Sequence, residues 1–394
     1  MSPGPVIVVA PDSLKGSCSA PEAARAIAAG ARSVLGPGAR VIELPLADGG
    51  EGTLDALIAA RGGRIVGVPT TDALGRERTG RIGFVPTAGD ADSAGAETAV
   101  IEAAEANGLP HVEDQPLRAL DADSAGVGVL VAAALDAGAR EILLCIGGSA
   151  TSDGGAGVLR ALGARLLDAE GEPVGPGARG LAGLASVDLS GVHPAASAAR
   201  WRIACDVENP LVGPRGAAEV FAPQKGATPE EIPLIDEGLR RLAGALGLPD
   251  SAAIERAGLG AAGGLALAPV ALWGAELVPG AELVAEAAGL DVAVASADLV
   301  VTGEGRLDAQ SLDGKVVSRV LGAAAQSPVA TVIVLAGEVS LGADGCRAAG
   351  ITAAASIARG PATLTELRER APALLEDAAA QLVSVWTAGR SRAC

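Results

Sequence analysis

Lysine is nearly absent from this chain of 394 residues: Lys15, Lys225 and Lys315 stand against twenty-seven arginines. Each of the three has a glycine as its neighbour in a polar, turn-rich segment. A planar guanidinium cannot replace a compact ammonium at every site, so a composition that spares three lysines favours a chemical role for them. Lysine beside glycine is a common arrangement for holding phosphate. The alternative is that three surviving lysines fell into loops by chance.

Histidine and aromatic residues are also scarce. The two histidines, His111 and His193, lie beside proline in turn-like stretches, which argues against a histidine-dependent triad or a zinc site. Any general base must then be a carboxylate. The chain has three Trp, two Phe and no Tyr, and its net charge is −17. Nucleic-acid binding needs a basic surface and stacking platforms, so we expect no nucleic-acid partner.

Long apolar runs and paired cysteines are missing as well. No run of about eighteen apolar residues exists, and Pro3 and Pro5 stand where a signal peptide would have its charged and apolar regions. We therefore expect no membrane association and a cytoplasmic protein. The cysteines are odd in number and lack CxxC spacing, which predicts free thiols. They are Cys18, Cys145, Cys205, Cys346 and Cys394.

Short apolar runs alternate with helical patterns along most of the chain. Residues 5–10 predict a strand, and the alanine-rich stretch 21–35 predicts a helix behind a Ser19 cap. Such alternation indicates an α/β fold with parallel sheets, whose ligands lie at the carboxyl ends of strands. Further strands are expected at 41–46, 141–146, 201–205, 297–302, 331–336 and 351–357, and helices at 53–60, at 158–166, from about 229 and at 363–386.

The segment 62–102 has a different pattern. Residues 64–69, 76–86 and 98–102 read as short strands separated by Asp, Gly and Pro turns, which predicts antiparallel pairing and a change of domain near Asp72. At 38.3 kDa the chain exceeds the size at which one core usually keeps growing, so two domains are expected. The segment 168–179 is interpreted as a simple turn.

A glycine-rich segment, residues 147–157, follows the predicted strand 141–146 and opens a helix. Successive glycines let backbone N–H groups approach an oxyanion, and a helix N-terminus adds positive potential. Ser149 and Asp153 within it favour a functional role, while a structural strand-to-helix turn remains the alternative. The segment has neither a Walker A sequence nor the dinucleotide fingerprint.

Polar clusters follow several other predicted strands. Asp48 and Glu51 could ligate magnesium, or they could form a helix cap with a capping-box glutamate. Asp12 and Lys15 could bind the carboxylate or phosphate of a substrate. Three further segments read as ligand loops, namely 205–210 with Asp206 and Asn209, 222–228 with Gln224 and Lys225, and 303–315 with Glu304, Arg306, Asp308, Gln310 and Lys315. Carboxylates, lysines, arginine and glycine loops with magnesium are the components of phosphoryl transfer.

Eight of these segments occur in the order found in the bacterial type I glycerate kinase family, which the chain resembles from about residue 6 to 357. They are PDSLKGS, LADGGEGT, IGGSATSDGGAG, ACDVENPLVGPRGA, FAPQKGA, GAAGGL, ADLVVTGEGRLDAQS and GK. The resemblance implies ATP-dependent phosphorylation of D-glycerate with Mg²⁺, giving 2-phosphoglycerate in the bacterial enzymes. It also implies a parallel-sheet Rossmann or flavodoxin-like domain and a mixed-sheet domain, with a cleft between them. The predicted domains are 1–72 with 291–394, and 73–290.

The resemblance assigns expected roles to the polar residues of these segments. Catalytic roles are expected for Asp206, Lys15, Arg306 and Asp308. Binding of D-glycerate or ATP is expected for Asp12, Ser149, Asn209, Gln224, Lys225 and Lys315. Metal binding is expected for Asp48, Glu51, Asp153 and Glu304. Which segment holds ATP and which holds glycerate stays open, as does the choice between a monomer and a homodimer.

Two other functions compete with this reading. A kinase for a related small sugar acid would use the same groups, and a non-catalytic nucleotide or metabolite sensor would need the binding loops but no base. A dehydrogenase is disfavoured because no dinucleotide fingerprint follows the first strand. Because the polar segments come from both chain ends and from the middle, the sequence predicts a site between two domains that closes on its substrates.

Overall fold

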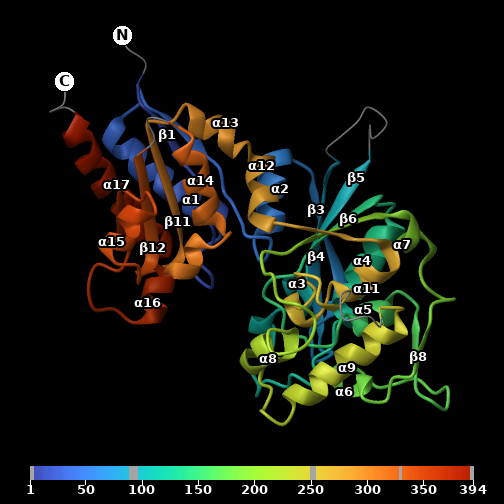
Figure 1. Ribbon diagram of the computed structural model, residues 1–394. Helices are drawn as coiled ribbons and strands as arrows, with labels where there is room; N and C mark the ends of the chain where they lie inside the picture. Colours follow the sequence, from blue (N-terminus) through green and yellow to red (C-terminus); the bar gives the residue numbers. More distant parts are fainter. Residues whose placement is uncertain (1–3, 88–95, 249–253, 328–330, 391–394) are drawn as a thin grey trace. The chain divides into compact units, whose positions relative to one another are not determined.

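The computed structural model describes residues 4–87, 96–248, 254–327 and 331–390, and its chain divides into two compact units (Figure 1). The first unit consists of Met1–Asp48, Asp55–Arg61 and Pro279–Cys394. The second consists of Gly49–Leu54 and Gly62–Val278. The chain ends therefore build one unit and the middle builds the other.

A five-stranded parallel sheet forms the centre of the first unit. Its order is β13-β12-β11-β1-β2, so the strand order reverses beside β1. Ligands of open α/β sheets bind at the carboxyl ends of strands next to such a reversal. The strands are β1 (Val6–Val9), β2 (Arg40–Glu43), β11 (Leu299–Leu307), β12 (Thr331–Val339) and β13 (Ala353–Ser356).

Helices cover both faces of this sheet. Ile333 and Leu335 pack toward α1 (Ala20–Leu35) and α17 (Ala371–Arg390), while Val334 and Ala336 pack toward α14 (Val316–Ala325) and α15 (Ala343–Ala348). The alternation follows from the two-residue period of a strand. The other helices are α2 (Thr53–Arg61), which spans the division between the units, α12 (Gly280–Ala288), α13 (Leu290–Ala295), η5 (Ala309–Leu312) and α16 (Leu364–Glu369).

Two helix predictions can be compared with the structure at their ends. Ser19 caps α1 as predicted, in a capping box with Glu22. The expected single helix 363–386 is instead two helices, α16 and α17, which meet at Arg370. Pro372 lies in the first turn of α17, where its missing N–H is tolerated, whereas it would disrupt a continuous helix.

Gly30 lets α1 and α17 approach closely. A Cβ built at Gly30 would lie 2.1 Å from the carbonyl oxygen of Glu376 in α17. We expect Gly30→Ala to lower the free energy of unfolding by about 1–3 kcal/mol, because backbone of one helix would have to move. Gly322→Ala in α14 is the control, since nothing lies within 4 Å of its Cβ position, and it should stabilise the protein by about 0.5–1 kcal/mol. Denaturant titration of both variants measures the two effects, and equal stabilities would contradict this account of the helix contact.

The second unit is built on a six-stranded mixed sheet of order β10-β9-β6-β5-β4-β3. The predicted antiparallel pairing within 62–102 is confirmed, because β3 pairs with β4 and β4 with β5 in that sense. β5, β6, β9 and β10 are parallel, so their carboxyl ends share one edge. The strands are β3 (Arg64–Thr71), β4 (Glu77–Pro86), β5 (Glu97–Glu102), β6 (Glu141–Cys145), β9 (Arg200–Ala204) and β10 (Glu276–Val278).

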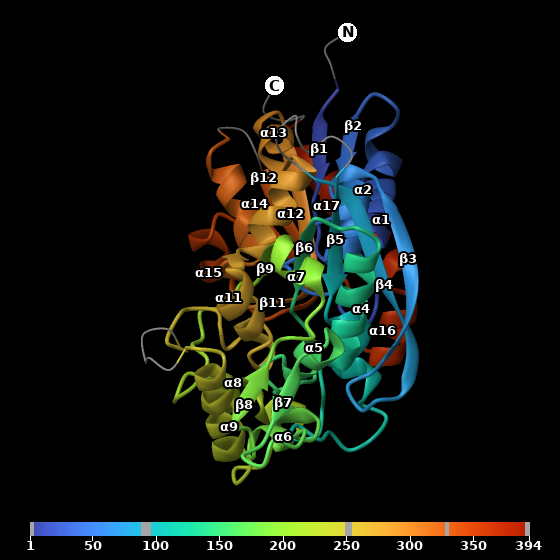
Figure 2. The same ribbon diagram turned by 90° about the vertical axis from the view of Figure 1, so that its right-hand side faces the viewer.

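Short helices and one hairpin complete this unit. Helix α9 packs against α6 and α8 (Figure 2), and Trp201 stacks on Trp273 in the core with ring centroids 4.5 Å apart. The hairpin consists of β7 (Arg165–Leu167) and β8 (Ser186–Asp188). The helices are α3 (Ala104–Asn107), η2 (Leu109–His111), α4 (Ala125–Asp136), α5 (Ala156–Ala161), α6 (Gly177–Leu181), α7 (Pro194–Ala198), α8 (Ala217–Phe221), η3 (Pro223–Lys225), α9 (Ile232–Ala245), η4 (Ala261–Gly263) and α11 (Leu267–Trp273).

The unit boundaries differ from those expected at 72–73 and 290–291. The structure divides the chain between Arg61 and Gly62 and between Val278 and Pro279. Strand β3 belongs to the second unit because it pairs with β4 along its whole length. Helices α12 and α13 belong to the first because they pack on α14, where Arg319 forms ion pairs with Glu282 and Asp291.

Two expectations about the whole chain concern membranes and cysteines. Among the residues that the structure describes, no helix has the length and apolar character needed to cross a bilayer. Cys18, Cys145, Cys205 and Cys346 are free, and Cys394 lies outside the described residues.

Candidate active site

Asp12 lies at the carboxyl end of β1, where the strand order of the first sheet reverses. Its backbone N–H donates to the carbonyl of Gly303 at 2.8 Å, and its Oδ1 accepts from the N–H of Ser13 at 2.6 Å. The residue is only 7% exposed. Burial, and then the negative charge of Asp48, raise the pKa of Asp12 to about 8. Asp12 is therefore a carboxyl group that can exchange a proton near neutral pH.

Three charged side chains surround this carboxyl group. Lys15 Nζ lies 3.7 Å from Asp48 Oδ2, and the charges of both residues act on Asp12. Glu304 comes from β11, and its Oε1 is buried without a hydrogen-bond partner among the described residues. Burial raises the pKa of Glu304. The structure thus brings four of the predicted site residues together, and we call Asp12, Lys15, Asp48 and Glu304 the carboxylate–lysine cluster.

The chain beyond Glu304 carries three more of the predicted charged residues. Arg306 Nε lies 3.6 Å from Asp308 Oδ2, and its guanidinium also pairs with Glu338. Asp308 caps η5, where its side chain accepts from the N–H of Gln310 at 2.8 Å. Lys315 is the N-cap residue of α14, and its charge and that of Asp308 act on Glu304. The exposed guanidinium of Arg306 is free to turn toward an anionic ligand by breaking ion pairs that are weak in solvent.

The glycine-rich segment of the second unit forms a hydrogen-bonded turn after β6. Ser149 Oγ lies 2.9 Å from Thr151 Oγ1, which also accepts from Asn107 Nδ2 at 2.9 Å. Asn107 ends α3, just after β5, so the turn joins the carboxyl ends of two neighbouring strands. A Cβ at Gly263 would lie 2.2 Å from the carbonyl oxygen of Thr151, which explains why a second glycine segment, 260–264, packs here.

Asp153 holds this turn in place from within. Its Oδ2 accepts from the backbone N–H and the hydroxyl of Ser124 and from the N–H of Gly157, and its Oδ1 accepts from the N–H of Gly155. Burial raises the pKa of Asp153, and these hydrogen bonds oppose that shift. The carboxylate oxygens are already used by four donors. Asp153 therefore supports the turn through these hydrogen bonds, and metal binding by Asp153 stays a prediction.

Lys225 is buried, with only 3% of its surface exposed, and is the last residue of η3. Its Nζ donates to the carbonyl of Thr151 at 2.5 Å, and the charge of Asp153 stabilises the ammonium. Burial nevertheless lowers the pKa of Lys225 to about 8. This lysine places an ammonium group against the glycine-rich turn.

The remaining predicted residues are placed less closely. Asp206 follows β9 and is half-buried. Asn209 Nδ2 donates to the carbonyl of Arg215 at 2.8 Å, so its amide organises the loop. Gln224 and Glu51 are exposed. Gln224 lies beside Lys225 in η3, but its side chain is exposed whereas that of Lys225 is buried.

The four predicted metal ligands are divided between the two units. Asp48 and Glu304 belong to the first unit, whereas Glu51 and Asp153 belong to the second. Across residues 4–87, 96–248, 254–327 and 331–390, no three His, Cys, Asp or Glu side chains gather as a ready-made metal site. Mg²⁺ is commonly held by one or two carboxylates together with substrate phosphates and water, so a smaller set can suffice.

Asp48 and Glu51 do not form the helix cap that the sequence offered as the alternative to a metal site. Helix α2 begins at Thr53, and the N–H of Leu54 in its first turn donates to Glu102 Oε1 at 2.7 Å. Burial raises the pKa of Glu102 to about 7. The acidic partner of this helix start thus comes from the end of β5, about fifty residues further along the chain.

Three polar residues of the second unit were missed by the sequence reasoning: Asn107, Ser124 and Thr151. Asn107 is fully buried and ties the end of β5 to the glycine-rich turn. The chain has only two asparagines, Asn107 and Asn209, and that scarcity is a signal that could have singled out Asn107. Ser124 carries no such signal, because its partner Asp153 is distant in sequence.

Two α/β units with carboxylates and lysines at strand ends, and a buried lysine on a glycine-rich turn, define an enzyme of the phosphoryl-transfer class. A model of the glycerate kinase family matches residues 7–387. The chain belongs to that family.

Similar proteins support this assignment over the whole chain. A glycerate kinase of Bacillus subtilis is 42% identical over 382 residues, which cover 96% of this chain and 97% of that protein. A glycerate 2-kinase of Escherichia coli is 42% identical over 311 residues, covering 79% of each. A crystal structure described as glycerate kinase 2 from Salmonella typhimurium LT2 has a TM-score of 0.81 and 42% identity, and covers 98% of this chain and 100% of that one. The predicted α/β fold with a parallel and a mixed sheet is confirmed.

Proposed function

We propose that this protein transfers the γ-phosphoryl group of ATP to D-glycerate and releases 2-phosphoglycerate and ADP. The observation that carries the proposal is the family match across residues 7–387, which contains both the carboxylate–lysine cluster and the Lys225 turn. A relative named glycerate 2-kinase, 42% identical, supports the 2-hydroxyl as acceptor.

Asp12 is our candidate for the general base. The glycerate oxygen attacks the γ-phosphorus, the bond from that phosphorus to the ADP oxygen breaks with its electron pair leaving on ADP, and the hydroxyl proton passes to a carboxylate. A base is most effective when its pKa lies near the working pH, and the pKa of Asp12 is about 8. Asp206, which sequence reasoning favoured, is half-buried and remains the second candidate.

Cationic side chains would neutralise the charge on the transferring group. Lys15 and Lys315 act on the carboxylates Asp12 and Glu304 respectively, and Arg306 is exposed beside Asp308. In the second unit, Lys225 and the N–H groups of the glycine-rich turn would hold the nucleotide phosphates. Phosphoryl transfer depends mainly on such positioning and charge neutralisation.

Asp48 and Glu304 are the residues we propose for Mg²⁺. The buried Oε1 of Glu304 has no hydrogen-bond partner among the described residues, and carboxylate oxygens are ligands that this hard cation prefers. The ion would neutralise charge on the nucleotide phosphates. Glu304→Gln should therefore raise the Mg²⁺ concentration that gives half-maximal activity.

The proposed reaction is tested by measuring ADP release with a panel of small hydroxy acids. D-glycerate should give the highest kcat/KM, above L-glycerate, D-lactate and the four-carbon sugar acids, since the family shares this substrate. Higher turnover of another hydroxy acid, with D-glycerate inactive at millimolar concentration, would replace the proposed substrate.

The pH dependence of kcat/KM should be bell-shaped with a maximum near pH 8. The acid limb arises because Asp12 must lose its proton to act as base, and its pKa is about 8. The alkaline limb arises because Lys225 must keep its proton, and its pKa is also about 8. Rates measured from pH 6 to 10 report these groups of the free enzyme.

Histidine variants provide the control for this profile. His111→Gln and His193→Gln should leave the acid limb in place, because burial lowers the pKa of His111 and the His193 ring pairs with Asp136, which is not among the proposed site residues. A profile that is flat from pH 6 to 9, or an acid limb that disappears with a histidine, would contradict the assignment to Asp12.

A further inference from the structure

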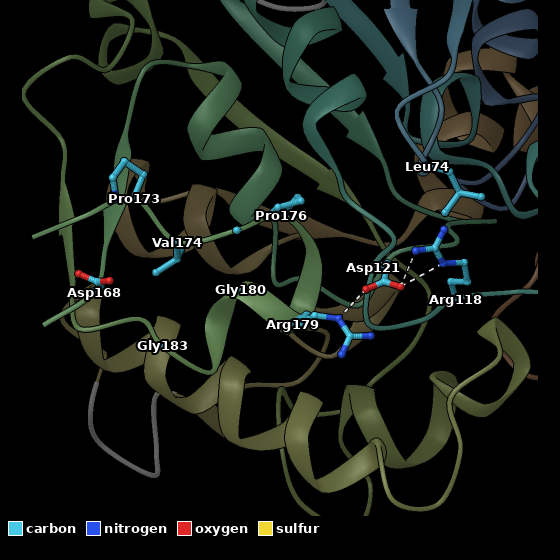
Figure 3. A pocket seen from close by; sticks show the side chains of 11 residues that line it. Leu74, Arg118, Asp121, Asp168, Pro173, Val174, Pro176, Arg179, Gly180 and Gly183 are labelled. Atoms are coloured by element: carbon cyan, nitrogen blue, oxygen red, sulfur yellow. Dashed lines mark hydrogen bonds and ion pairs between the residues drawn. The ribbon is translucent and has the colours of Figure 1, made fainter. Parts of the chain in front are cut away.

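A pocket of about 630 Å³ opens in the second unit, outside the groups discussed so far (Figure 3). Its walls include Leu74 after β3, Arg118 and Asp121 before α4, and Val174 and Arg179 from the segment that the sequence suggested was a simple turn. Small-molecule sites commonly have volumes of about 300–1,000 Å³ and a largely apolar lining. The size suits one nucleoside.

Two arginines present planar surfaces at this pocket. Asp121 Oδ1 accepts from Arg179 Nε at 2.7 Å, and Asp121 Oδ2 accepts from Arg118 Nε at 3.0 Å, as Figure 3 shows. The two guanidinium groups are held by their edges, and both side chains are more than half exposed. The face of a guanidinium stacks on aromatic rings.

The chain offers few aromatic platforms for a nucleobase. It has no tyrosine and only five aromatic residues of other kinds, and two of these, Trp201 and Trp273, stack on each other. At the pocket, the faces of Arg118 and Arg179 together with the aliphatic surfaces of Leu74 and Val174 supply a substitute.

The charge of the pocket favours a neutral ring over a polyanion. Arg118 and Arg179 are balanced by Asp121 and by Asp168, which also lines the pocket. The charge of Glu231 acts on Arg179 as well. A site for a free polyphosphate would need an excess of positive charge, which is absent from this lining.

The pocket adjoins the turn that carries Lys225. Leu74 packs in one apolar cluster with Ala150, which lies between Ser149 and Thr151. Leu117, the neighbour of Arg118, lies against Gly226, where a Cβ would come within 2.6 Å of it. The same wall therefore connects the pocket to both segments that we propose for phosphate binding.

We propose that this pocket receives the purine nucleoside of the nucleotide co-substrate, with the base against Arg118 and Arg179. The inference rests on the proposed function in that the phosphates are taken to bind at the Lys225 turn. It assigns the nucleotide to the second unit, a choice that the sequence left open.

Gly183→Leu tests the assignment by filling the pocket. Gly183 lines it, and nothing lies within 4 Å of its Cβ position, so the new side chain meets open space and not protein. Gly244→Leu is the matched control, since it too has open space but lies in α9 outside the lining. Binding of ADP, adenosine and inorganic tripolyphosphate is measured by calorimetry, and KM for ATP and for D-glycerate by steady-state kinetics.

The expected result for Gly183→Leu is at least a tenfold weaker binding of ADP and adenosine and a tenfold higher KM for ATP. Tripolyphosphate binding and KM for D-glycerate should stay within twofold of wild type, and Gly244→Leu should match wild type throughout. Arg179→Leu should weaken ADP binding in the same direction without filling the pocket.

Three outcomes test this inference separately from the proposed function. Unchanged ADP and adenosine binding in Gly183→Leu, in a protein that phosphorylates glycerate, overturns the nucleoside assignment and leaves the proposed function standing. Loss of tripolyphosphate binding with unchanged adenosine binding overturns it too and marks an anion site. If the wild type phosphorylates no hydroxy acid but Gly183→Leu loses ADP binding, the nucleoside assignment is supported and the proposed function is refuted.

Discussion

Asp12→Asn is expected to lower kcat by about 10²- to 10⁴-fold, or roughly 3–5 kcal/mol of transition-state stabilisation. Asparagine has nearly the same shape but cannot take up the hydroxyl proton of glycerate. Because the pKa of Asp12 is about 8, the group is mostly neutral at pH 7, so a neutral amide should leave the fold intact. Circular dichroism and thermal unfolding verify the fold, and a coupled ADP assay measures kcat.

Asp206→Asn is the comparison that decides which carboxylate is the base. Asp206 follows β9 in the second unit and is half-buried. If Asp12 is the base, Asp206→Asn should change KM more than kcat and should keep the acid limb of the pH profile. An active Asp12→Asn enzyme beside an inactive Asp206→Asn enzyme would transfer the role to Asp206.

Lys225→Arg is expected to lower kcat/KM by about ten- to a thousandfold, or roughly 1.4–4 kcal/mol. Lys225 is buried and its Nζ donates to the carbonyl of Thr151, so a larger planar guanidinium would displace the glycine-rich turn. The charge is retained, and the loss therefore reports geometry. Lys225→Met separates the two effects, since it nearly keeps the volume and removes the charge.

The stability of the wild type should reveal the same buried ammonium. Because the pKa of Lys225 falls from 10.5 to about 8 on folding, the unfolded chain binds more protons between those values. This residue therefore makes the free energy of unfolding rise with pH from about 8 to 10.5, and the rise should be absent in Lys225→Met. Arg347→Lys, at an exposed position, is the control for exchanging one cationic side chain for another in Lys225→Arg, and it should leave kcat/KM unchanged. Full activity of Lys225→Arg would remove the chemical interpretation of the scarce lysines.

Much of the fold follows from local sequence patterns. The runs 5–10 and 141–146 are strands because β-branched and aliphatic residues there are buried on both faces, as in β1 and β6. The unit boundaries could not be placed in the same way. Whether residues 64–71 belong to one sheet or the other depends on their pairing with β4, which is a contact distant in sequence and not a local property.

The site was less predictable than the fold. Asp12 and Lys15 were found because they follow β1 in the sequence, so a local pattern is enough to place them at the carboxyl end of a strand. The role of Asp153 could not be read from the chain, since it depends on Ser124, which reaches it from 29 residues away. The segment 168–179 looked like a turn because the pocket that it lines is completed by residues distant in sequence, among them Leu74 and Arg118.

The position of the phosphate in the product tests the central claim most directly. Proton-coupled ³¹P NMR of the product formed from D-glycerate and ATP distinguishes the two hydroxyls by the number of protons on the esterified carbon. We predict a doublet, because a phosphate on the 2-hydroxyl couples to one proton. A triplet, from the two protons of a primary phosphate ester, or no new ester signal under turnover conditions, would contradict the account.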